Sequence, residues 1–187
     1  MGNFYKWLLE KRMGWRIETS VPLPRKCVIC VAPHTSNWDF ILGELYIRSI
    51  GETANFLMKR EWFFWPLGIL LRRMGGVPVE RSKKTSLTDQ LAEQAGKAET
   101  FRLAVTPEGT RSRVEHWKRG FYFVALKAKL PILLYAIDYR QKRIVCTKQV
   151  VPSGNVEADM SEILAYYAEG DFSARYPEKF YANPELP

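Results

Sequence analysis

The chain has 187 residues, of which 47% are hydrophobic, so it can bury a core of ordinary size, and disorder is excluded as its main state. Its formal net charge of +8 at pH 7 indicates a negative partner: nucleic acid, anionic lipid or a phosphorylated substrate. Three cysteines do not suggest a disulfide framework and no signal peptide is recognisable, so we expect a reducing, cytoplasmic location.

The N-terminal segment from Phe4 to Arg16 mixes bulky apolar side chains with Lys and Arg. Such a composition suits a helix within residues 1–20 that lies at a membrane interface, where aromatic groups enter the headgroup region and basic groups meet anionic lipid. The alternative is a helix that simply packs on the domain. Pro22 and Pro24 then mark a linker into the first strand of the core.

The stretch from Cys27 to Phe40 changes from β-branched residues, which predict a buried strand, to small polar residues, which predict a corner before a helix. His34 lies at this corner, and Asp39 lies in the first turn of the predicted helix. The Asp39 carboxylate can fold back toward the imidazole and fix one ring nitrogen, which leaves the other free to take a proton from a hydroxyl. A local hydrogen bond without a catalytic role is the alternative.

Cys27 and Cys30 form a C-x-x-C pair close to His34, which raises the alternative of a zinc or redox site. Residues three apart on a strand point to opposite faces, however, and no second pair of ligands follows in the sequence. We therefore expect buried structural thiols and no metal.

The most apolar part of the chain is the segment from Trp62 to Leu71, whose ten residues are too few to cross a bilayer that needs about 20 in a helix. One prediction is a buried helix with Pro66 near its start. The other is a wall for an acyl chain or a surface that touches a membrane.

Hydrophobic periodicity and turn residues predict the remaining elements. The predicted helices span 38–50, 85–99 and 120–129, with a last one capped by Asn155, and the predicted strands span 55–58, 101–105, 131–138 and 144–151, with a short one inside 75–81. This alternation predicts an α/β fold, a single layered domain with a mostly parallel central sheet flanked by helices.

A second polar corner follows the strand predicted over 101–105, where Thr106 to Arg113 reads TPEGTRSR. Arg can hold phosphate oxygens through two parallel hydrogen bonds, and Gly109 lets backbone N–H groups come close, so this turn suits a phosphate. Corners at the carboxyl ends of parallel strands share one edge of a sheet, so we expect His34, Arg81 and this turn to converge on one cleft.

Four motifs, in this order, resemble those of the glycerolipid acyltransferases, a family that includes the 1-acylglycerol-3-phosphate acyltransferases. They are PHTSNWD with the H-x-x-x-x-D (HX4D) pattern, GGVPVER, TPEGTRS and LPILL, all within residues 26–140. The resemblance implies that His34 is the general base and Asp39 its orienting partner. It also implies an acceptor site made of Glu108, Gly109, Thr110 and Arg111, with Arg81 and Lys59 binding the acceptor phosphate.

The implied reaction, part of phospholipid biosynthesis, moves a fatty acyl group from a thioester to a lipid hydroxyl, such as that of 1-acylglycerol-3-phosphate. The expected partners are a lysophospholipid, acyl-CoA or acyl carrier protein as co-substrate, and an anionic membrane surface; neither a further cofactor nor nucleic acid is expected. Residues 1–187 are then one acyltransferase domain, peripherally associated with the inner face of the membrane. The alternative is a non-catalytic basic module that binds anionic lipid or RNA, which would leave His34 and Asp39 without a role.

Overall fold

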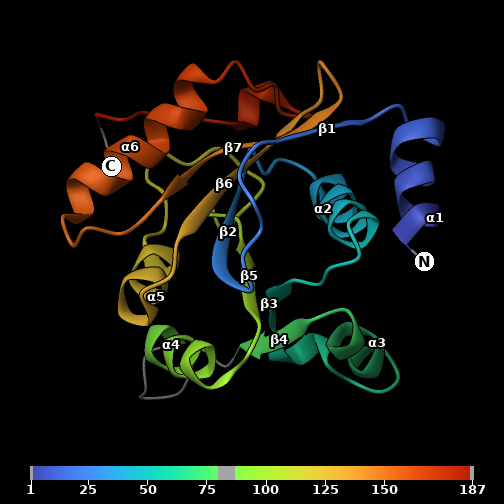
Figure 1. Cartoon of the computed structure of the whole chain (residues 1–187). Helices are drawn as coiled ribbons and strands as arrows, with labels where there is room; N and C mark the ends of the chain where they lie inside the picture. The colour runs from blue at the N-terminus through green and yellow to red at the C-terminus, as the bar shows by residue number, and fades with distance from the viewer. Residues whose placement is uncertain (1, 80–86, 186–187) are drawn as a thin grey trace.

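Seven strands build one sheet in the computed structural model, which describes residues 2–79 and 87–185 (Figure 1). The strands are β1 (Arg16–Thr19), β2 (Lys26–Ala32), β3 (Asn55–Lys59), β4 (Gly76–Val79), β5 (Phe101–Val105), β6 (Ile132–Asp138) and β7 (Arg143–Val150). The helices are α1 (Gly2–Trp7), η1 (Leu8–Arg12), α2 (Asn37–Ser49), η2 (Arg60–Trp62), α3 (Leu67–Arg73), α4 (Leu87–Lys97), α5 (Gly120–Ala128), α6 (Val156–Glu169) and η3 (Pro177–Lys179).

The strand order is β1-β7-β6-β2-β5-β3-β4, and each neighbouring pair is parallel except β6 and β7. This confirms the predicted α/β fold with a mostly parallel sheet. Strand β2 lies at the centre, between β5 and β6, and runs parallel to both. The residues that follow these three strands therefore meet at one edge of the sheet.

Helices cover both faces of the sheet, with α1, α2 and α3 on one side and α4, α5 and α6 on the other (Figure 1). Successive side chains of a strand point to opposite faces, so β2 places Cys27 in the core beneath α2 and Cys30 in the core beneath α5 and α6. Both thiols are free and buried, as predicted. Burial raises the pKa of Cys27 to about 12, which keeps this thiol protonated at neutral pH.

The N-terminal segment differs from the prediction. Helix α1 continues into the π-helical turn η1, which ends at Arg12, and residues 16–19 form strand β1, paired in parallel with β7. Trp15 is buried and meets the Tyr139 ring edge-on, with 5.2 Å between ring centroids. The predicted N-terminal helix is therefore shorter than expected, because a strand that the sequence did not indicate begins at Arg16.

The segment from Trp62 to Leu71 is not a buried helix, which corrects that prediction. Helix α3 begins at Leu67, and only Gly68 and Leu71 among its residues are buried. Trp65, just before the helix, is 82% exposed. The surface alternative remains a prediction for this segment. None of the helices in the described ranges is long and apolar enough to span a bilayer.

Candidate active site

The corner between β2 and α2 is fixed by a capping box at the start of the helix. Ser36 is the N-cap residue, and its side chain accepts a hydrogen bond from the first helical turn. Asp39 returns the interaction, because its Oδ2 accepts from the Ser36 backbone N–H at 2.8 Å. The same oxygen accepts from the Thr35 backbone N–H, also at 2.8 Å. Local capping therefore explains why a carboxylate five residues after His34 points back at it.

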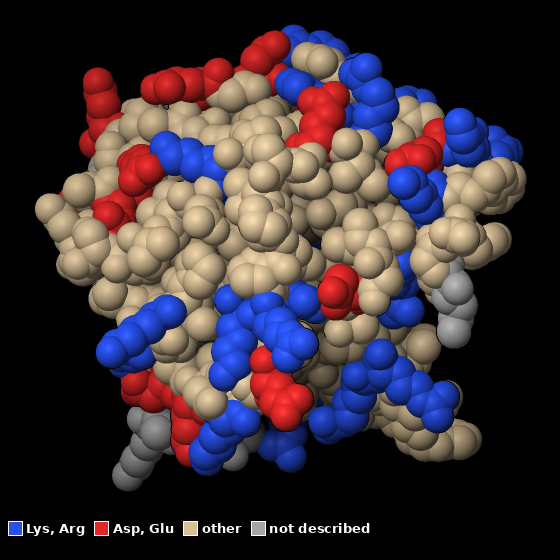
Figure 2. Space-filling view, viewed as in Figure 1, with Lys and Arg blue, Asp and Glu red and all other residues tan. Residues whose placement is uncertain are grey.

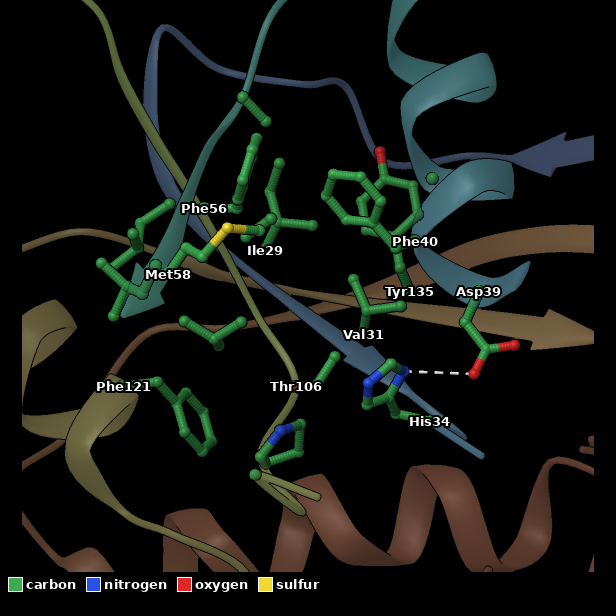
Figure 3. Close-up of a pocket in the computed structure, with 18 of the residues that line it drawn as sticks. Ile29, Val31, His34, Asp39, Phe40, Phe56, Met58, Thr106, Phe121 and Tyr135 are labelled. Atoms are coloured by element: carbon green, nitrogen blue, oxygen red, sulfur yellow. Dashed lines mark hydrogen bonds and ion pairs between the residues drawn. The ribbon is translucent and has the colours of Figure 1, made fainter. Parts of the chain in front are cut away.

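His34 and Asp39 form the predicted pair. The imidazole Nδ1 lies 3.1 Å from Asp39 Oδ2, as the dashed line in Figure 3 shows. Asp39 is 3% exposed, whereas the His34 side chain keeps 17% of its surface open. A carboxylate at Nδ1 favours the tautomer with the proton on that nitrogen, so Nε2 is the basic atom.

A tyrosine that the sequence did not indicate completes the surroundings of Asp39. The Tyr139 hydroxyl donates to Asp39 Oδ1 at 2.6 Å. Tyr139 follows directly after β6, whose carboxyl end lies beside that of β2. Burial and the bond to the carboxylate both raise the pKa of Tyr139 above its ordinary value, so it remains a hydrogen-bond donor.

Glu108 ties the TPEGTR turn to the His34 corner. Its Oε1 accepts from the His34 backbone N–H at 2.8 Å, and the residue is only 4% exposed. Its second oxygen, Oε2, is buried and has no hydrogen-bond partner among the residues that the structure describes. Burial raises the pKa of Glu108 to about 7. The residue predicted to belong to the acceptor site thus lies beneath the corner between β2 and α2 and contacts His34.

The exposed part of the same turn reaches back to helix α2. Gly109 has a left-handed backbone with φ of +65° and lines a cavity described below, and Thr110 is exposed. The Arg111 guanidinium donates to the side-chain oxygen of Asn37, in the first turn of α2. The cavity also has the basic side chain of Lys118 in its wall, a residue that no motif indicated.

One of the two remaining predicted phosphate ligands lies farther along the sheet. Lys59 ends β3, where its backbone is in register with Val79 of β4. Arg81 lies outside the described residues. Two strands, β5 and β3, separate β2 from β4, so the end of β4 is about 14 Å from the end of β2 at the usual strand spacing.

A largely apolar cavity of about 840 Å³ opens beside His34. In Figure 3 the His34 ring and Thr106 lie at one end of the group of side chains, and aromatic and aliphatic residues extend away from them. Among the labelled lining residues are Ile29, Phe40, Phe56, Met58, Phe121 and Tyr135. No residue from Trp62 to Leu71 lines this cavity, so that segment does not form the wall that the sequence suggested.

Within residues 2–79 and 87–185, no three His, Cys, Asp or Glu side chains come close enough together to hold a metal ion.

A strand-to-helix corner that presents a carboxylate-oriented imidazole to an apolar cavity defines an enzyme site suited to taking a proton from a hydroxyl of a lipid-like substrate. Comparison with known proteins identifies the family to which this enzyme belongs. A model of the family described as Acyltransferase matches residues 15–138, well over half of the chain. The chain therefore belongs to the acyltransferase family and is an enzyme, as the motifs implied, which sets aside the non-catalytic alternative.

One solved structure reproduces the fold. The crystal structure of the 1-acyl-sn-glycerophosphate (LPA) acyltransferase PlsC from Thermotoga maritima aligns with a TM-score of 0.58 and 20% identity, over 90% of this chain and 75% of that chain. The search of curated proteins found no match. Tyr139 is the first residue beyond the range that the family model matches.

Proposed function

We propose that the protein transfers a fatty acyl group from acyl-CoA or acyl carrier protein to a hydroxyl of a phosphate-bearing lysolipid, such as 1-acylglycerol-3-phosphate. The observation that carries this proposal is the His34 imidazole, held through Nδ1 by Asp39 at the mouth of an apolar cavity. Family membership supports the acyl transfer, and the choice of acceptor follows from the motifs and the positive charges near the site.

In the proposed reaction, His34 Nε2 takes the proton of the acceptor hydroxyl as the oxygen attacks the thioester carbonyl. The new C–O bond forms and the C–S bond breaks, and the imidazolium returns the proton to the departing thiolate. General-base catalysis of this kind contributes about 100- to 10,000-fold in rate. Alignment of both substrates at one base supplies a further part, because the reactants need not meet in solution.

The cavity provides room for an acyl chain. Its volume of about 840 Å³ lies within the range of about 300–1,000 Å³ typical of ligand pockets. Side chains from β2, β3, α2 and α5 form its apolar walls. An acyl chain lying there would bring its carbonyl carbon to the polar end, beside His34.

Positive side chains near the polar end support a phosphate-bearing acceptor. Arg111 is exposed and reaches Asn37, which lines the cavity, and Lys118 lines the cavity itself. The resemblance adds Arg81 and Lys59 as phosphate ligands. Arginine is suited to this task because its two parallel N–H groups match phosphate oxygens.

The acceptor and the product are lipids, so we also propose peripheral binding to the inner face of an anionic membrane. Two exposed aromatic regions on the same side of the sheet support this (Figure 1). One is α1, with Phe4 and Trp7 exposed. The other, here called the α3 patch, comprises Trp62, Phe64, Trp65, Ile69 and Leu70. Figure 2 shows Lys and Arg side chains beside uncharged surface over both α1 and α3.

The test is turnover of a labelled acyl thioester, supplied on coenzyme A or on acyl carrier protein, with acceptors that carry or lack a phosphate. We expect an acylated phosphate-bearing product, and we expect His34→Ala to abolish transfer while the fold is kept, because the side chain serves chemistry at an open corner. Asp39→Asn should be less severe, since an amide still bonds the ring but cannot stabilise its charged form.

The matched control is His116→Ala, because His116 is the only other histidine of the chain and is exposed away from the cavity lining. Its activity should equal that of the wild type. Near-normal turnover by His34→Ala would refute the mechanism, and equal use of acceptors with and without phosphate would refute the acceptor class.

A further inference from the structure

The carboxylate of Asp39 is held by donors on both of its oxygens, and these donors have different origins. His34 Nδ1 and the backbone N–H groups of Thr35 and Ser36 all meet Oδ2, and all belong to the PHTSNWD motif. Within the described part of the chain, the Tyr139 hydroxyl is the only donor that meets Oδ1, and it comes from beyond the family-matched range.

Tyr139 is itself fixed by three separate parts of the chain. Its backbone continues β6, and its N–H donates to the Ser173 carbonyl at 2.8 Å. Its ring lies edge-on to the buried Trp15 ring, at an interplanar angle of 86°. Contacts with the N-terminal segment, the sheet and the C-terminal segment together therefore position the Tyr139 hydroxyl against Asp39.

We propose that Tyr139 is a positioning residue of the His34–Asp39 pair, which restrains rotation of the Asp39 carboxylate about its Cβ–Cγ bond and shares its negative charge. The donors on Oδ2 hold one oxygen, and the Tyr139 hydroxyl holds the other, so the carboxylate keeps the orientation in which Oδ2 meets the imidazole. This inference rests on the proposed role of His34 as the general base.

The hydroxyl also affects the charge that His34 experiences. A donor on Oδ1 draws part of the negative charge away from Oδ2, so its loss would leave His34 facing a stronger charge and holding its proton more tightly. Glu108 from the TPEGTR turn acts electrostatically on this pair, and Arg175 from the C-terminal segment acts on Tyr139. A Tyr139→Phe variant removes one hydroxyl and leaves Glu108 and Arg175 in place.

The first test compares Tyr139→Phe with Tyr166→Phe in the full chain. Tyr166 is a suitable control because its hydroxyl also pairs with one side chain, that of Thr147, and neither residue lines the cavity. We expect kcat of Tyr139→Phe to fall by about 10-fold, as for the loss of a charge-assisted hydrogen bond, with both KM values little changed. The acid limb of its pH–rate profile should move to higher pH. A kcat and profile equal to those of Tyr166→Phe would overturn the proposal.

The second test needs no turnover. The chain has two histidines, so an NMR titration gives one signal for His34 and one for His116, which serves as an internal reference. In Tyr139→Phe the titration midpoint of His34 should rise relative to that of His116. An unchanged midpoint contradicts the proposed charge sharing even if the activity falls.

The two proposals can fail separately. If His34→Ala retains turnover, the general-base proposal is wrong, while the titration still reports whether Tyr139 acts on the pair. If His34→Ala is inactive but Tyr139→Phe matches its control in kcat, pH profile and titration, only the positioning role is wrong.

Discussion

The buried side chain of Glu108 makes the stability of the fold depend on pH. Burial disfavours the carboxylate form and raises the pKa of Glu108 from an ordinary 4.5 to about 7 in the folded protein. Between these values the folded protein binds a proton that the unfolded chain has released, so a rise in pH through this interval destabilises the fold. The free energy of unfolding is therefore expected to be lower above pH 7 than below the unfolded-state pKa, by on the order of 3 kcal/mol.

We therefore predict that Glu108→Gln gains stability relative to the wild type as the pH rises from about 5 to about 8, since the amide carries no charge to bury. Thermal unfolding at both pH values measures this difference. Glu115→Gln, an exposed change in the same connection, should show no such trend. A stability difference for Glu108→Gln that is the same at both pH values would contradict the prediction.

Arg111 carries the prediction for acceptor recognition. Arg111→Ala should raise KM for a phosphate-bearing acceptor by about 10-fold or more, and KM for the thioester less, if a charge-assisted hydrogen bond worth about 1.5–3 kcal/mol is lost. Arg111→Lys should restore binding only in part, because a point charge cannot reproduce two parallel N–H groups. Arg81→Ala should behave in the same way, although Arg81 lies outside the described residues.

The control for Arg111 is Arg119→Ala, which removes the same charge from a side chain bonded twice to Glu157. Its acceptor KM should stay close to that of the wild type. In the unliganded protein Arg111 donates to Asn37, so a purely structural role is the competing explanation. That role would appear as lower thermal stability with both KM values disturbed alike.

At the scale of single residues, the sequence predicts those contacts that are local. The His34–Asp39 distance follows from a capping box whose members lie within a few positions of one another. Tyr139 lies 100 positions from Asp39 in the sequence, and motif spacing does not predict a contact between residues so far apart. The depth of Glu108 was likewise invisible, since burial is set by the elements that pack around a turn and not by its composition.

At the scale of elements, the α3 patch carries the prediction for membrane binding. Trp65→Ala should weaken binding to vesicles that contain anionic lipid on the order of 10-fold, because a Trp side chain offers about 200 Å² of surface to the headgroup region. Val151→Ala serves as the control, since Val151 is 68% exposed but lies at the end of β7. Equal sedimentation of both variants would exclude the α3 patch as the contact.

The role of the N-terminal helix in membrane binding is better tested by a point substitution than by deletion of the helix. Leu9 and Trp15 are fully or almost fully buried, so deleting residues 1–16 would disturb the core. Replacing the exposed Trp7 by Ala instead removes only surface that could enter a membrane.

The same elements show where hydrophobicity misleads. The segment from Trp62 to Leu71 is apolar enough to predict burial, yet most of its large side chains are exposed, because a hydrophobic run does not say which surface it will meet. Strand β1 was missed for the opposite reason. Its sequence, RIET, is short and polar, and it becomes a strand only by pairing with β7.

At the scale of the whole molecule, the alternation of strands and helices predicts the parallel layer and the shared edge where His34 and the TPEGTR turn meet. It does not predict that β7 reverses direction and lies between β6 and β1. The reversal depends on a short turn after Asp138, while the partner of β7 at the sheet margin comes from the opposite end of the chain.

That arrangement has a consequence for exchanging parts between relatives. Tyr139 and the C-terminal segment reach the corner between β2 and α2 from beyond residue 138: the Tyr176 backbone N–H donates to the Thr35 hydroxyl at 3.2 Å, and Tyr139 donates to Asp39. A chimera joined after Asp138 would inherit its motifs from one parent and the groups that hold them in place from the other. The smallest interchangeable module of this enzyme is therefore longer than the stretch by which its family is identified.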